Sequence, residues 1–149
     1  MRIRKVLFIA LISAYVVSCN NPTLISKADY NWPLEKVIQV TNDGLQVKTP
    51  DIFAFEVTVF FEKEGIVLGE DGALIRMIMG DKGYYYLTAK GFKTVYVLQW
   101  VEGGLAIKKE IKVSDEGLIN PFFNQKKTNV LLVDGDNSYS INFTGIIGE

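Results

Sequence analysis

Residues able to do covalent or acid–base chemistry are few in this chain, because its 149 residues include one cysteine and no histidine. The cysteine, Cys19, stands where an apolar run ends and a polar segment begins. A thiol at such a point can be alkylated by a lipid, whereas the side chains of serine and alanine cannot. The lack of histidine excludes Ser-His-Asp and Cys-His nucleophilic sites, histidine metal sites and histidine pH switching.

A basic start and a short apolar run precede the cysteine. Arg2, Arg4 and Lys5 are followed by twelve almost purely apolar residues, 6–17. A membrane-spanning helix needs about 20 apolar residues, so this run is too short for a stable span. A positive n-region, a short apolar region and a small residue before a cut site are typical of a secretory signal peptide.

The tetrapeptide Val16-Val17-Ser18-Cys19 resembles the lipobox of bacterial lipoproteins. The resemblance covers residues 1–19 and implies that the leader 1–18 is removed and that Cys19 carries a diacylglycerol thioether. Each buried CH₂ adds about 0.8 kcal/mol, and two or more acyl chains anchor stably. We therefore expect a lipidated tether over 19–33, which binds membrane lipid through the acyl chains on Cys19. The alternatives are an ordinary core cysteine and a cleaved leader beside an incidental thiol.

The residue after the cysteine bears on location. Asn20 stands where aspartate, in lipoproteins of the enteric type, resembles an inner-membrane retention mark. No acidic cluster follows Cys19, as it would in some surface-displayed lipoproteins. We expect a cell-envelope protein anchored to the outer membrane and facing the periplasm.

The charge of residues 19–149 argues against nucleic acid as a partner. Their 13 Lys and Arg against 17 Asp and Glu give a net charge of −4, and Arg76 is the one arginine among them. Nucleic-acid binding requires clustered Lys and Arg. About 130 residues can bury a single core, so one domain is expected over 34–149.

Short apolar runs separated by Gly, Asp and Asn turns predict an all-β domain. Apolar and polar residues alternate most cleanly over 52–62, where only Phe60 breaks the pattern. The run 92–101 is apolar on both faces, as in a central strand. The run 105–113 has a charged face that is typical of an edge strand. Turns at 42–44, 80–83 and 135–137 predict hairpins. We expect an antiparallel β-sandwich of about eight strands, immunoglobulin-like or transthyretin-like, with a small β-barrel as the alternative and no amphipathic helix. The expected strands are 37–41, 45–49, 52–62, 73–79, 84–89, 92–101, 105–113, 129–134 and 138–144.

Two groups of side chains invite a ligand, and each has a structural alternative. Asp134 and Asp136 lie with an amide and a hydroxyl in one turn, and such hard oxygen ligands suit calcium. The distal glutamate of an EF-hand is missing, so a plain hairpin turn is the preferred interpretation, and neither a metal nor a cofactor is expected. Tyr84, Tyr85 and Tyr86, with Trp32 and Trp100, suggest a sugar-stacking platform, but strand alternation sends Tyr85 to the opposite face.

The segment 120–127 is the candidate partner-binding loop. Phe122 and Phe123 stand between turn residues, with Lys126 and Lys127 behind them. Two exposed phenylalanines would indicate a docking point. The alternative is that one or both close an open end of the sandwich.

Neither Ser-x-x-Lys, Gly-x-Ser-x-Gly nor His-Glu-x-x-His occurs, so no active site is expected. The favoured hypothesis is a non-catalytic binding or assembly module of a cell-envelope complex with an envelope protein as its partner. Small accessory lipoproteins of type VI-like secretion systems are similar in size and class only. A glycan or small-ligand binder, a carboxylate enzyme and an inhibitor of a hydrolase remain the alternatives.

Overall fold

The computed structural model describes residues 34–40, 46–48, 54–69, 72–102 and 104–148. The expected leader and tether, with Cys19 and Trp32, lie outside these ranges. The chain separates between residues 30 and 31 into two units, and every element below belongs to the second, Asn31–Glu149. Within the described part, no helix combines the length and the apolar composition needed to cross a bilayer.

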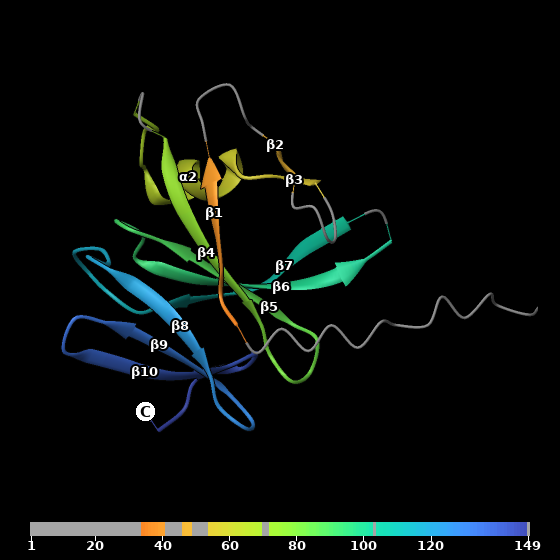
Figure 1. The fold of residues 1–149 in the computed structure, drawn as a ribbon, viewed down its shortest axis with the longest axis vertical. Helices are drawn as coiled ribbons and strands as arrows, with labels where there is room; N and C mark the ends of the chain where they lie inside the picture. The colour runs from red at the N-terminus through yellow and green to blue at the C-terminus, as the bar shows by residue number, and fades with distance from the viewer. Residues whose placement is uncertain (1–33, 41–45, 49–53, 70–71, 103, 149) are drawn as a thin grey trace, which may run out of the picture. The chain divides into compact units, whose positions relative to one another are not determined.

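Antiparallel strands dominate the described chain, which confirms the all-β sandwich (Figure 1). A five-stranded sheet has the order β1-β4-β5-β6-β7, a four-stranded sheet the order β11-β10-β9-β8, and β2 pairs with β3. Apart from β1, each of the two large sheets is built from strands that follow one another along the chain. In an immunoglobulin sandwich the chain instead alternates between the two sheets. The strands are β1 (Lys36–Val40), β2 (Gln46–Lys48), β3 (Ala54–Glu56), β4 (Ala73–Met79), β5 (Tyr85–Ala89), β6 (Thr94–Val101), β7 (Gly104–Lys112), β8 (Pro121–Gln125), β9 (Val130–Asp134), β10 (Asn137–Asn142) and β11 (Gly145–Ile146).

The five-stranded sheet is buried on both faces, because successive side chains of a strand point to opposite sides. On β6, Tyr96 and Leu98 belong to a first core, which also contains residues of the helix α2 (Thr58–Glu64). Val95 and Val97 belong to a second core, shared with the four-stranded sheet. The two apolar faces of 92–101 therefore do mark a central strand, as expected.

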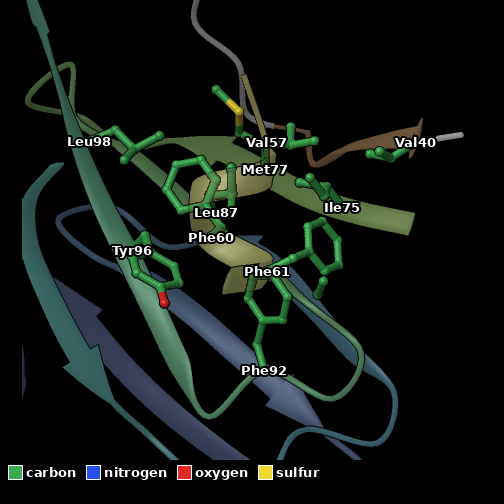
Figure 2. Packing of buried hydrophobic residues seen from close by; sticks show 11 residues of the cluster. Val40, Val57, Phe60, Phe61, Ile75, Met77, Leu87, Phe92, Tyr96 and Leu98 are labelled. Atoms are coloured by element: carbon green, nitrogen blue, oxygen red, sulfur yellow. The ribbon is translucent and has the colours of Figure 1, made fainter. Parts of the chain in front are cut away.

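The strand expected over 52–62 is wrong beyond Glu56, where the chain forms α2. Val57, Phe60 and Phe61 are all buried and lie three and four positions apart, which is the spacing of one helical face. A strand would have placed the adjacent residues Phe60 and Phe61 on opposite sides. Figure 2 shows both rings directed toward Phe92 and Tyr96. The helix ends at Gly65, whose φ of 69° is left-handed.

Glu64, at the last turn of α2, fastens the helix to the sheet. Its carboxylate accepts hydrogen bonds from the Tyr96 hydroxyl at 2.8 Å and from the Lys93 backbone N–H at 2.7 Å. Burial, and then the hydrogen bond to Glu64, raise the pKa of Tyr96 well above the usual tyrosine range. Burial also raises the pKa of Tyr86 to about 12, with help from Asp81 and Tyr84.

The hairpins expected at 80–83 and 135–137 are present as β4–β5 and β9–β10. The turn expected at 42–44 lies outside the described residues, and the described residues of the flanking strands belong to different sheets, β1 beside β4 and β2 beside β3. The edge position expected for 105–113 is confirmed for β7, but the apolar residues of this run do not share one face. The register between β6 and β7 shifts at Val97/Leu98, so that Ile107 faces the first core and Ile111 the second.

Candidate functional site: an apolar groove beside β4

A groove of about 700 Å³ lies along the first half of β4. Three aliphatic side chains that line it are strongly exposed: Val67 at 92%, Ile119 at 75% and Leu74 at 46%. The remaining described lining residues are Gln39, Phe61, Ile66, Leu68, Gly69, Gly72, Ala73, Arg76, Lys90, Gly91, Asn120 and Pro121.

The floor of the groove is a part of the five-stranded sheet that the second sheet leaves uncovered. Gln39 of β1 is the register partner of Leu74 on β4, so their side chains share one face. Ile78, further along β4 on that same face, is fully buried under the second sheet. Leu74 remains nearly half exposed, and this difference along one strand marks where the cover ends.

One wall is the segment 66–69, which leaves α2 at its left-handed glycine. The backbone N–H of Ile66 donates to the Phe61 carbonyl at 2.9 Å, and the Ile66 side chain packs against the first core. Its neighbour Val67 points outward. The wall is thus held by the helix end and by the partly buried side chains of Ile66 and Leu68.

The opposite wall, 117–121, is held by Asp134. Its carboxylate accepts hydrogen bonds from the backbone N–H groups of Ile119, at 3.0 Å, and Asn120, at 2.6 Å. On the other side, the N–H of Leu118 donates to the Phe92 carbonyl at 2.8 Å. Gly117 has a φ of 104°, and a Cβ there would lie 2.6 Å from the Gly91 carbonyl oxygen. The exposed Ile119 side chain therefore stands on a tightly held backbone.

An ion pair closes the end of the groove where β4 approaches β8. Glu35 accepts from Arg76 Nη1 at 2.8 Å and, through its other oxygen, from the Phe123 backbone N–H at 2.7 Å. Both side chains are mostly buried, at 13% and 23% exposed. β8 is the last strand of its sheet, so Glu35 occupies a backbone donor on an open sheet edge.

The groove offers aliphatic surface, two amides and two cations, Arg76 and Lys90, while its described lining contains no acidic residue. A mostly apolar hollow with a few convergent polar groups is the usual form of a binding site. The arrangement is suited to holding a ligand.

The expected partner-binding residues lie elsewhere and do not form one exposed loop. Phe122 and Phe123 belong to strand β8, and Phe123 is 3% exposed in the second core, which corrects its assignment as a docking residue. Phe122 is half-buried. Lys126 and Lys127 are exposed in the turn that follows, where the Lys126 N–H bonds the Asn129 carbonyl.

The acidic turn contains a clamp and an exposed carboxylate. Asp134 is occupied by the two N–H groups described above, and Asp136 is exposed. Among the described residues no group of three Asp, Glu, Cys or His side chains could hold a metal ion. The two hydrogen bonds to the 117–121 segment give the Asp134 carboxylate a structural role.

The tyrosines follow the expected alternation. Tyr84 and Tyr86 belong to the second core and Tyr85 packs against the first, so they form no common platform. Tyr84 stacks on Phe143 with ring centroids 4.9 Å apart. Trp100 is 54% exposed on β6 and lies outside the described groove lining.

A second, more polar hollow of about 590 Å³ lies beside the 112–117 segment. Lys112 Nζ and Asp115 Oδ1 form an ion pair at 2.5 Å across its rim, and both side chains are exposed. The hydrogen bond from Lys112 lowers the pKa of Asp115. Ser114 accepts the Gly117 N–H at 3.0 Å. These three polar groups satisfy local partners and leave less to offer a ligand than the apolar groove does.

Sequence reasoning did not find Val67, Leu74 or Ile119. Single aliphatic residues near turns usually pack inward, so their exposure depends on which sheet covers which strand. Glu35 carried no signal either, because its two partners follow it by 41 and 88 positions.

Comparison with protein-family models, curated proteins and solved structures finds no match to this chain.

Proposed function

We propose that the protein is a membrane-anchored, non-catalytic module of the cell envelope that docks a protein partner in the groove beside β4. The observation that carries the proposal is the exposure of Val67, Leu74 and Ile119 around one hollow. Single exposed apolar residues are ordinary, whereas several that share a concave surface are typical of an interaction site.

Energetics support docking at this place. Burial of apolar surface contributes about 25 cal/mol per Å², and Val67 and Ile119 are largely exposed in the unbound domain. Asp134 and the end of α2 already hold both walls, so little ordering of the backbone opposes binding.

The anchor part of the proposal depends on residues 1–19. Their basic start, short apolar run and terminal Ser18-Cys19 resemble a lipoprotein leader. Lipid on Cys19 would hold the domain at the outer membrane, on its periplasmic face, within reach of envelope proteins. A stable anchor suits a module that assembles with partners in the same membrane.

Site-specific photo-crosslinking in the producing cells tests the docking. A benzophenone amino acid at Ile119 should give a discrete adduct with one envelope protein. The same amino acid at Ile147, another exposed aliphatic position that is not part of the described lining, serves as the control. Equal adducts at both positions, or none at Ile119, would refute docking in the groove.

A further inference from the structure

The described lining of the groove contains two cations, of which Arg76 is paired with Glu35 and Lys90 has no described ion pair, and this second cation indicates what the occupant carries. Lys90 lines it, is exposed, and has no ion pair within the described part of the chain. Arg76 also lines it, with Nη1 bound to Glu35. Residues 19–149 carry a net charge of −4, whereas the charged side chain of the described lining that has no described ion pair is a cation.

We infer that the partner segment is aliphatic and carries a carboxylate that pairs with Lys90. This inference rests on the docking function proposed above. Aliphatic side chains of the segment would contact Val67, Leu74 and Ile119, and an Asp or Glu beside them would meet the ammonium group. Charge complementarity of this kind sets partner choice and register more than affinity.

Lys90 is fixed close to the apolar surface by its place in the chain. It follows β5 directly and precedes Gly91, whose N–H donates to the Leu118 carbonyl at 2.7 Å. Ile119 is the next residue after Leu118. The cation and the most exposed aliphatic residue of that wall are therefore joined through one backbone hydrogen bond, and one ligand segment can reach both.

The chemistry selects a protein segment over a fatty acid or a phospholipid. The exposed apolar side chains of the groove come from three separate elements, the 66–69 segment, β4 and the 117–121 segment. Three spaced contacts match side chains that project from a backbone. A single acyl chain would instead be enclosed along its length.

A random peptide library displayed on phage, selected against the full chain in lipid nanodiscs, tests the inference. Empty nanodiscs remove lipid-binding clones. Selected peptides should combine aliphatic residues with Asp or Glu, and soluble copies should bind roughly five- to tenfold more weakly to Lys90→Glu, the equivalent of about 1 to 1.4 kcal/mol. Lys108→Glu is the charge-matched control, because Lys108 is exposed on β7 and lies outside the described lining. Every variant keeps Glu70 and Asp71, two acidic residues that follow the lining residue Gly69 in the sequence and lie outside the described residues.

Selection on Lys90→Glu separates the two proposals. A switch from acidic to basic peptides supports the carboxylate partner. Aliphatic peptides with no charge preference on either protein would overturn the inference and leave docking intact. Peptides that bind Val67→Asp and Ile119→Asp as well as the wild type would overturn both.

Discussion

The carboxylate of Glu35 accepts a hydrogen bond from the backbone N–H of Phe123 at 2.7 Å, across 88 positions of sequence. Glu35 directly precedes β1 of the five-stranded sheet, and Phe123 lies on β8 of the other. The same carboxylate pairs with Arg76, so one side chain joins the start of the domain to both sheets.

Glu35→Ala should lower the free energy of unfolding by about 2 to 3 kcal/mol, because it leaves a mostly buried guanidinium and a backbone N–H without their partner. Urea denaturation measures the change. Glu35→Gln keeps an acceptor for Phe123 and should lose about 1 kcal/mol. Lys112→Ala, which breaks an exposed ion pair, should change stability by less than about 0.5 kcal/mol; a loss as large as that of Glu35→Ala would contradict this account.

The Tyr96–Glu64 contact predicts that stability falls at alkaline pH. The folded-state pKa of Tyr96 is raised by burial and by its bond to Glu64, while an unfolded tyrosine ionises near pH 10. The raised pKa contributes stability that is complete below pH 10 and is lost as the pH rises through the folded-state pKa. The slope is up to about 1.4 kcal/mol per pH unit for each such proton.

Tyr96→Phe isolates this effect. At pH 7 it should cost about 1 kcal/mol, because Glu64 loses one donor. Above pH 10 its stability should decline less steeply than that of the wild type, in denaturation curves taken at several pH values. Tyr86, whose pKa is raised to about 12, maintains part of the decline in both proteins. If the stability of both proteins declined with the same slope above pH 10, the pKa of Tyr96 would not be raised in the folded state.

Asp134→Ala should release the 117–121 wall. Two backbone N–H groups lose their acceptor, so we expect a stability loss of about 1 to 2 kcal/mol and faster hydrogen exchange at Ile119 and Asn120. Asp134→Asn retains one acceptor oxygen, so its stability should lie between those of the wild type and Asp134→Ala. Calcium should not raise the melting temperature of the wild type; a rise that depends on Asp134 would restore the metal interpretation.

Cys19→Ala should prevent lipidation and leave the domain fold intact. Fractionation should then place the variant outside the membrane pellet. Mass spectrometry of the wild type should show a chain that begins at Cys19 and carries acyl groups. A variant that stays in the membrane fraction would refute the anchor, whereas the groove would be unaffected.

Segment 52–62 shows how far alternation predicts structure. Its apolar residues at 53, 55, 57, 59 and 61 fit the alternation of a strand. Phe60 does not fit it, and in the structure Phe60 is buried on one face of a helix. This exception to the alternation was the signal for the helix. Position 57 together with 60 and 61 satisfies the helical period, and Val59 is left 40% exposed. The first core required two adjacent aromatic residues on one side, which only a helix provides.

The hairpins and the central strand were predictable because local turn chemistry and alternation encode them. The groove was not, since it exists where the second sheet stops short of β1. Whether Phe123 or Ile119 is exposed depends on that boundary, and the boundary is fixed by contacts such as Glu35–Phe123 that join distant parts of the chain.

The register shift of β7 makes one nine-residue strand contribute to both cores. Loss of β7 would expose apolar surface of both cores, so the stability of each core depends on the same strand. The domain should show a single calorimetric transition, and damage anywhere along that strand should be felt by the entire fold.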